Sequence, residues 1–204
     1  MPDKDKEKDK DKKTAAQELF QEKKEPYDLS NFTILVVEDS LYMQSLITSM
    51  LKVFGVGDIM VAEGAKEAIE VLTVTQARSK SKYITRVDIV LTDWLMNKGN
   101  GEELVRWIRR HEKDDVRFLP VVVVSGYATE HLTSRARDIG ANETLVKPVS
   151  AKGLASRVCS VIDHPRPFVN VPGFFGPDRR RQQIKFVGPD RRKFKPEEIV
   201  QVKK

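Results

Sequence analysis

The sequence predicts an α/β domain built on a five-stranded parallel sheet that is doubly wound, with disordered or semi-ordered tails at both ends. Between residues 31 and 162, five short apolar runs rich in β-branched residues alternate with five stretches in which apolar residues recur every three or four positions. Each run is too continuously apolar for a half-exposed antiparallel strand, which favours a sheet buried on both faces. Five βα units in tandem therefore predict an open doubly wound domain.

The expected elements follow one another along this central region. The strands are expected in the runs FTILVVE (32–38), DIMVAE (58–63), VDIVLTD (87–93), PVVVVS (120–125) and ETLVK (143–147). The helices are expected at roughly 40–53, 65–78, 101–112, 129–139 and 150–162, where the apolar spacing is helical, as in MQSLITSMLKVF. The connection at 73–86 is long, and we expect either an extended helix or a basic surface loop.

The region before the first strand, 1–30, reads as a charged arm. Its opening, MPDKDKEKDKDKK, alternates opposite charges without an apolar face and is predicted to stay disordered. A short helix is expected over 14–24, ended by Pro26.

Composition limits the class of protein. The chain has 204 residues, of which 40% are hydrophobic and 32% charged, enough for one domain of about 100–150 residues with extra segments. The single Cys159 cannot form an internal disulfide, and we find neither a signal peptide nor an apolar run of about 18 residues. We therefore expect a reduced, cytoplasmic protein without a membrane span.

Polar residues stand where the predicted strands end. Glu38 and Asp39 follow the first strand, Asp93 ends the third, Ser125 ends the fourth and Lys147 ends the fifth. Open parallel sheets bind ligands at this carboxyl edge. A single Ser or Asp at a strand end commonly caps the next helix, and each residue alone has that explanation. Together, however, three carboxylates at one edge repel each other unless a cation lies among them, and one lysine is a poor match for three.

The composition of this group favours Mg²⁺ and phosphate chemistry. Oxygen ligands without a His/Cys cluster are typical of a magnesium site rather than a zinc site. Ser125 can donate a hydrogen bond to a phosphoryl oxygen, and Lys147 can neutralise one of its charges. Asp93 is then free to act as the nucleophile, because aspartate forms acyl phosphates when a metal offsets the charge repulsion.

Four segments resemble the signature segments of bacterial two-component receiver domains, as in chemotaxis-type single-domain response regulators. They are ILVVEDS, VDIVLTDWLM, VVVVSG and GANETLVKP, and they occur in the family's order at the strand ends. The resemblance covers roughly 31–162 and implies the flavodoxin-like receiver fold. It also implies a two-component phosphorelay protein that is not itself an enzyme.

For the acceptor site, the resemblance makes Asp93 the phosphoacceptor, which takes its phosphoryl group from a histidine kinase or phosphotransfer protein. Glu38 and Asp39 would hold Mg²⁺ together with Asp93 and the backbone carbonyl of Leu95. Phosphorylation would then change the affinity of the protein for a downstream partner that the sequence does not identify.

For the switch, the resemblance makes Ser125 and Lys147 the residues that bind the phosphoryl group. Lys147 precedes Pro148, and this bond is often cis in the family. Thr144 stands where receivers usually carry a Tyr or Phe that couples phosphorylation to the output face, and Tyr127 is a candidate substitute.

The C-terminal segment, 163–204, is basic and contains a repeat. It holds eleven Lys/Arg and five Asp/Glu, an excess equal to the net charge of +6 of the whole chain. FGPDRR at 175–180 recurs as VGPDRR at 187–192, twelve residues later. Gly-Pro-Asp favours a turn, so each copy is expected to present paired arginines at a bend. The candidate binding residues are Arg179, Arg180, Arg181, Arg191 and Arg192.

Three hypotheses remain open for this tail. It is a linear motif that docks on a protein surface, an arginine-rich site for a cyclic dinucleotide or nucleic acid, or a solvated extension without function. Its low apolar content predicts that it orders only on contact with something. The second hypothesis supports a rival function, in which the domain is a receiver-fold module that binds a nucleotide through its tail. A small phosphatase using the same acids is a third option.

Overall fold

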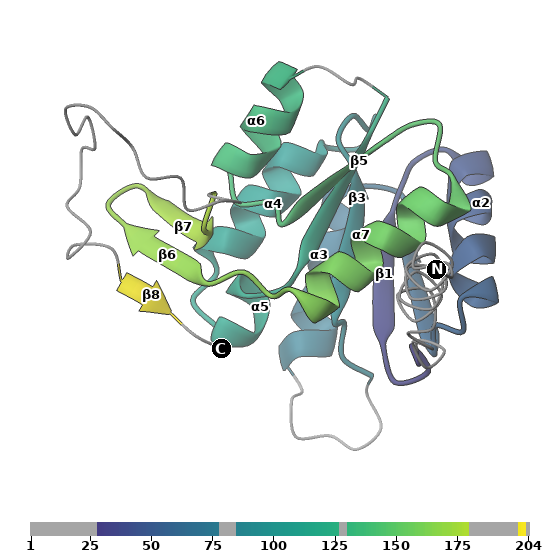
Figure 1. Ribbon diagram of the computed structural model, residues 1–204, viewed down its shortest axis with the longest axis horizontal. Helices are drawn as coiled ribbons and strands as arrows, with labels where there is room; N and C mark the ends of the chain where they lie inside the picture. Colours follow the sequence, from purple (N-terminus) through teal and green to yellow (C-terminus); the bar gives the residue numbers. More distant parts are fainter. Residues whose placement is uncertain (1–27, 78–84, 127–129, 180–199, 203–204) are drawn as a thin grey trace, which may run out of the picture.

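A parallel sheet of five strands forms the centre of the computed structural model, which describes residues 28–77, 85–126, 130–179 and 200–202. The strands are β1 (Thr33–Val37), β2 (Asp58–Ala62), β3 (Ile89–Asp93), β4 (Val121–Ser125) and β5 (Glu143–Val146). They pair in the order β2-β1-β3-β4-β5, and every pairing is parallel (Figure 1). The predicted fold class and all five predicted strands are confirmed.

The three central strands of the sheet are buried on both faces, as their continuous apolar runs predict. All residues of β1, β3 and β4 are buried. Because alternate side chains of a strand point to opposite faces, Leu35 and Val37 join one apolar cluster while Ile34 and Val36 join the other. The two clusters are the two layers of the core.

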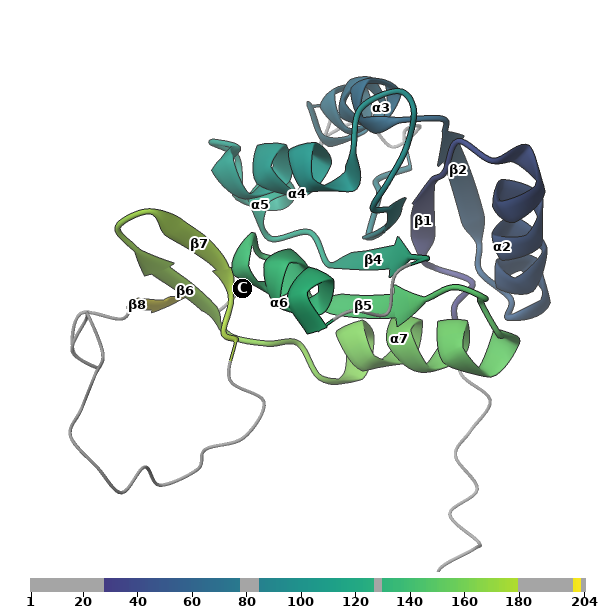
Figure 2. The same ribbon diagram turned by 90° about the horizontal axis from the view of Figure 1, so that it is seen from above.

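Helices cover both faces. α2 (Leu41–Val53) and α7 (Ala151–Asp163) pack into one apolar cluster. α3 (Ala65–Ala77), α4 (Gly101–Arg110), α5 (Asp114–Arg117) and α6 (Glu130–Asp138) lie on the other face. Figure 2 shows α4 and α7 on opposite sides of β4 and β5. The side chain of Ser40 accepts a hydrogen bond from the Met43 amide, which makes Ser40 the N-cap of α2.

One helix was not predicted. α4 ends at Arg110 rather than continuing to 112, because His111 has an extended backbone. The separate helix α5 then follows, with Asp114 and Asp115 in its first turn. A four-residue helix is too short to show helical periodicity in the sequence.

The described part of the C-terminal segment forms a second, smaller sheet. β6 (Phe168–Val171) pairs antiparallel with β7 (Phe174–Pro177) on one side and with β8 (Val200–Val202) on the other. β7 contacts α4, and the hairpin lies beside α4 and α5 in Figure 1. We expected this segment to order only on contact with something, and its hairpin is ordered on the domain of the same chain.

Several predictions fall outside the described residues. These are the arm at 1–27 with its expected short helix, residues 78–84 of the connection at 73–86, and the candidate aromatic Tyr127. Four tail arginines also lie outside the described residues: Arg180, Arg181, Arg191 and Arg192. None of the helices that the structure describes is both long and apolar enough to cross a membrane.

Candidate metal centre at the carboxyl edge of the sheet

Three strands bring two acids and one lysine together at one edge of the sheet. β1 lies between β2 and β3, and β4 separates β3 from β5. Glu38 directly follows β1, Asp93 is the last residue of β3, and Lys147 directly follows β5. Parallel strands share one carboxyl edge, so residues far apart in the sequence meet there.

The ammonium of Lys147 bridges the two acids. Its Nζ lies 2.8 Å from Oε2 of Glu38 and 2.9 Å from Oδ2 of Asp93. Glu38 is 2% exposed and Asp93 is 7% exposed, so water contributes little to neutralising either carboxylate. A buried charge requires a partner, and Lys147 is a shared partner of both.

Burial and this bridge shift the ionisation of the group. Burial raises the pKa of the Glu38 carboxyl above its usual range, although the hydrogen bond from Lys147 opposes that shift. Burial alone would lower the pKa of Lys147, but its hydrogen bonds to Glu38 and Asp93 and their charges raise it instead. Lys147 therefore remains an ammonium at neutral pH.

Backbone amides hold the carboxylates in place. The Trp94 amide donates to Oδ1 of Asp93 at 2.7 Å, and the Asn97 amide donates to Oδ2 of Asp39 at 2.8 Å. The Ser40 amide donates to Oε1 of Glu38 at 3.3 Å. The sequence did not reveal these donors. Every residue except proline carries a backbone amide, and only the path of the folded chain determines which amides point at the carboxylates.

The three acids form a set that fits a divalent cation. One oxygen each from Glu38, Asp39 and Asp93 lies within 4.8 Å of the others. The set is entirely oxygen and carries up to three negative charges, which suits a hard ion such as Mg²⁺. The sequence-predicted metal ligands are thus brought together by the fold. The assignment of the Leu95 carbonyl as a further ligand stays a prediction.

Ser125 lies at the same edge. It ends β4, is 4% exposed, and pairs with Val146 of β5. Its carbonyl accepts a hydrogen bond from the Lys147 amide at 2.7 Å, which ties the ends of β4 and β5 together. The Lys147–Pro148 peptide bond is cis, as the resemblance implies. Thr144 is half-buried in β5, three residues before Lys147.

The tail arginine that the structure describes is already engaged within the chain. Arg179 pairs with Asp138 at 2.6 Å, and its guanidinium lies 4.8 Å from the centre of the Phe174 ring. This arrangement offers no support for the hypothesis that the tail binds a cyclic dinucleotide or nucleic acid.

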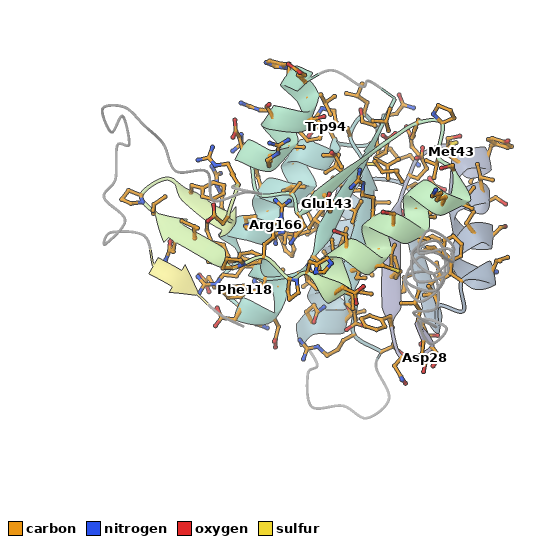
Figure 3. All side chains as sticks on the ribbon, viewed as in Figure 1. Asp28, Met43, Trp94, Phe118, Glu143 and Arg166 are labelled. Carbon is orange, nitrogen blue, oxygen red and sulfur yellow. The ribbon has the colours of Figure 1, made fainter. Side chains whose placement is uncertain are left out.

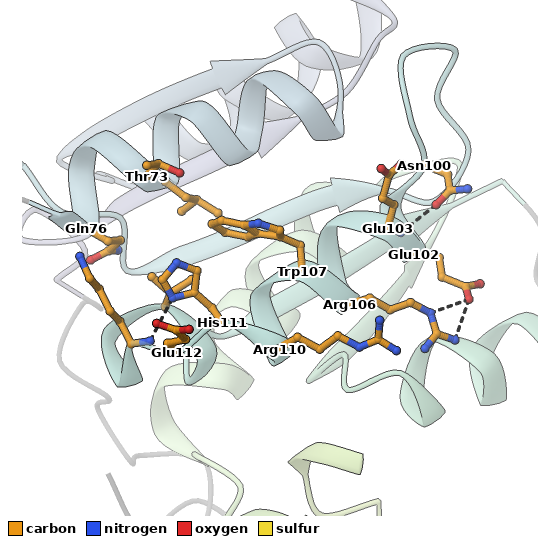
Figure 4. Close-up of a pocket in the computed structure, with 13 residues that line it drawn as sticks. Thr73, Gln76, Asn100, Glu102, Glu103, Arg106, Trp107, Arg110, His111 and Glu112 are labelled. Carbon is orange, nitrogen blue, oxygen red and sulfur yellow. Dashed lines mark hydrogen bonds and ion pairs between the residues drawn. The ribbon is translucent and has the colours of Figure 1, made fainter. Parts of the chain in front are cut away.

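A separate groove lies between α3 and α4. It has a volume of about 860 Å³, and Trp107 and His111 stack edge-to-face within it with ring centres 4.9 Å apart (Figure 4). Arg106, Arg110 and Glu112 also line it, so its charge is mixed. None of the five residues predicted to act at the carboxyl edge lines this groove.

Comparisons with known proteins agree with this geometry. The family model described as a response regulator receiver domain matches residues 34–159. A chemotaxis protein CheY homolog of Campylobacter jejuni is 31% identical over 129 residues, which cover 63% of this chain and 91% of that protein.

Two solved structures are also similar. A putative response regulator from Chloroflexus aurantiacus has a TM-score of 0.56 at 20% identity, covering 65% of this chain and 98% of that one, which supports the fold alone. A CheX–CheY–BeF3–Mg complex from Borrelia burgdorferi contains a similar chain with a TM-score of 0.55 at 25% identity. The match covers 64% of this chain and 89% of that one.

Proposed function

Because the chain belongs to the response regulator receiver domain family, we propose that it accepts a phosphoryl group on Asp93 from a histidine kinase or phosphotransfer protein and thereby changes its affinity for a partner. The observation that carries this proposal is the placement of Asp93 among Glu38, Asp39 and Lys147 at the carboxyl edge. Membership of the family supports a role in two-component signalling.

Asp93 is the nucleophile in this proposal. One of its carboxylate oxygens forms a bond to phosphorus while the bond from phosphorus to the donor's imidazole nitrogen breaks, and the imidazole leaves with the electron pair. Glu38, Asp39 and Asp93 would hold Mg²⁺, whose positive charge would offset the repulsion between the phosphoryl group and these acids. The Trp94 amide on Oδ1 fixes the orientation of the carboxylate.

Lys147 and Ser125 respond to the new group. The Lys147 ammonium already contacts Asp93 and has three donor hydrogens, so it can pair with a phosphoryl oxygen without moving far. The Ser125 hydroxyl, at the end of the neighbouring strand β4, can donate a hydrogen bond to another oxygen. β4 leads into α6 and β5 leads into α7, so a shift of these two strand ends reaches the helices that follow them.

Phosphorylation of the full chain by acetyl phosphate with Mg²⁺, or by a competent donor kinase, tests this function. Mass spectrometry should find a hydroxylamine-labile adduct on Asp93, which the Asp93→Asn variant and chelation of Mg²⁺ both abolish. If neither donor gives an adduct at this residue, the proposal fails while the fold assignment stands.

We further infer that the chain carries a phosphoryl group rather than acting as an enzyme on separate substrates. The acids that a phosphatase would use to activate water are the same acids that would bind Mg²⁺ and accept the phosphoryl group. Steady turnover of a phosphomonoester that is lost in Asp93→Asn would contradict this inference.

A further inference from the structure

The hairpin of β6 and β7 places the first copy of the repeated motif on a defined surface of the domain. We call this the docking surface, and it consists of Arg117, Phe118, Asp138, Gly140 and Phe168. The first four belong to the receiver domain, and Phe168 belongs to β6. Figure 3 shows Phe118 beside the hairpin, with Glu143 and Arg166 nearby. Arg166 pairs with Glu143 at 3.3 Å and fixes the start of the hairpin to β5.

The aromatic ring of Phe175 provides the apolar contact of the docked copy. It meets Phe118 edge-to-face with ring centres 5.2 Å apart, and Phe168 at 5.4 Å. The guanidinium of Arg117 lies 4.6 Å from the centre of the Phe175 ring. Three side chains of the docking surface therefore pack against this ring.

Gly176 follows at a point where the hairpin backbone approaches the domain closely. A Cβ atom at this position would lie 2.9 Å from the Cα of Gly140, so only glycine fits without moving backbone. Gly140 itself has a φ of 104°, and a Cβ there would meet the side chain of Arg109. The docking surface thus selects glycine in the motif by sterics.

The end of the motif makes polar contacts. The Asp178 amide donates to the Pro167 carbonyl at 2.8 Å, and the Asp178 carbonyl accepts from Arg166 at 3.4 Å. Arg179 pairs with Asp138 and stacks on Phe174. Gly176 and Arg179 are therefore matched by specific contacts, whereas Asp178 is held through its backbone atoms.

The chain contains a second sequence with the same features. Residues 186–191 read FVGPDR, which is identical to FFGPDR at five of six positions. The difference is Val187 in place of Phe175, which keeps an apolar side chain and loses the ring. This second copy lies outside the described residues, so its identity as a ligand follows from its sequence and from the contacts of the first copy.

We propose that the docking surface is a binding site for the F-x-G-P-D-R motif, and that the second copy exchanges with the first on the same surface of the same chain. Exchange shifts the register of the tail by twelve residues. The docking surface includes none of the acids at the carboxyl edge, and the proposal does not depend on phosphorylation of Asp93.

The lengths of the connecting segments allow the exchange within one chain. After the shift, residues 192–199 would still connect the motif to β8. Eight residues reach up to about 28 Å. β7 and β8 flank β6, so they are about 10 Å apart in the sheet. β8 can therefore keep its pairing with β6 in both registers.

The same lengths explain why the first copy occupies the surface in the structure. Two residues now connect β6 to the docked motif, whereas fourteen would do so after exchange. Exchange also shortens the connection to β8 from twenty residues to eight, so loop-closure entropy alone favours the first register by about fivefold. The missing ring at Val187 favours the first copy further. The second copy is thus a minor occupant that takes over when the first is weakened.

A double-mutant cycle on thermal unfolding of the full chain tests the exchange. Gly176→Val blocks the first copy and Gly188→Val blocks the second. Gly188→Val alone should leave the unfolding midpoint unchanged, and the double variant should lose more than the sum of the two single losses. If Gly176→Val does not fold, Arg179→Ala with Arg191→Ala provides the milder cycle. A second-copy variant that is silent in both backgrounds overturns the proposal.

Disulfide trapping identifies the occupant directly. In a Cys159→Ser background that also carries Gly176→Val, Asn170→Cys is combined with Val187→Cys or, as a control, with Lys185→Cys. Asn170 pairs with Phe175 in the hairpin, and Val187 is the counterpart of Phe175 in the second copy. We expect the 170–187 disulfide to form faster than the 170–185 disulfide, within single chains, because directly opposed residues of two antiparallel strands lie within disulfide range. Equal rates, or a 170–187 disulfide found only between two chains, would overturn the exchange within one chain.

Discussion

Lys147 and Asp93 form a contact of 2.9 Å between an ammonium and a buried carboxylate, and the same ammonium lies 2.8 Å from Glu38. One positive charge therefore compensates two acids that water barely reaches. This arrangement links the stability of the domain to its proposed chemistry, because Lys147, which we propose to bind an incoming phosphoryl oxygen, also holds Glu38 and Asp93 together.

Replacing Lys147 should destabilise the domain when Mg²⁺ is absent. In Lys147→Ala, Glu38 and Asp93 lose the cation that they share, and we expect the free energy of unfolding to fall by about 2–4 kcal/mol. Unfolding in urea with a chelator measures this loss. Adding Mg²⁺ should restore part of it, and so should a second change, Glu38→Gln. A Lys147→Ala variant as stable as the wild type would contradict the importance of the bridge.

Binding of Mg²⁺ should weaken as the pH falls. The weakening should begin at a higher pH than it would at a site whose glutamate ligand is exposed and has its ordinary pKa. A ligand carboxylate must lose its proton, and burial raises the pKa of Glu38, so a proton competes with the metal earlier in an acid titration. Magnesium titrations followed by Trp94 fluorescence in a Trp107→Phe background measure the affinity. In Glu38→Gln, this part of the pH dependence should disappear. Affinity independent of pH down to the usual range of glutamate would refute the expectation.

The sequence predicts the carboxyl edge well because the relevant information is local. Each strand is an apolar run, each candidate site residue stands at or just after its end, and parallel pairing brings the ends together. Glu38, Asp39 and Asp93 could therefore be grouped without knowing the strand order. The bridge made by Lys147 could not be derived in this way, because it depends on how far each side chain reaches.

Arg109 is a buried residue whose role the sequence pattern does not reveal. In the run EELVRWIRR it looks like one of several surface arginines, yet it is 5% exposed, whereas its neighbour Arg110 is exposed. Its guanidinium donates to the carbonyls of Gly140, Arg117 and Leu119 and to the side chain of Asn142. These acceptors come from segments up to 33 residues away, so local sequence carries no signal of the contact.

Replacing Arg109 should therefore cost far more stability than replacing Arg110. Burial lowers the pKa of Arg109 to about 9, so the guanidinium is still charged at neutral pH. Removing this side chain leaves several buried acceptors without a hydrogen-bond donor. We expect Arg109→Ala to lower the free energy of unfolding by about 3 kcal/mol or more. Arg109→Lys should not rescue it, because an ammonium lacks the planar fork. Urea unfolding provides the measurement, with Arg110→Ala as the matched control. Equal losses at the two positions would show that the buried network contributes little.

The hydroxyl of Ser125 should be needed for the response to a phosphoryl group. Beryllofluoride with Mg²⁺ should shift the amide signals of Ser125 and Lys147 together, because the Lys147 amide donates to the Ser125 carbonyl at 2.7 Å. Ser125→Ala removes a donor at a buried strand end and should reduce both the affinity for the mimic and the shift at Lys147.

The matched control is Ser125→Thr, which keeps the hydroxyl and should respond like the wild type. NMR titration of the full chain compares the three proteins. An alanine variant that binds the mimic and shifts Lys147 as the wild type does would remove Ser125 from the switch. Lys147 would then have to couple β3 to β5 through its contact with Asp93 alone.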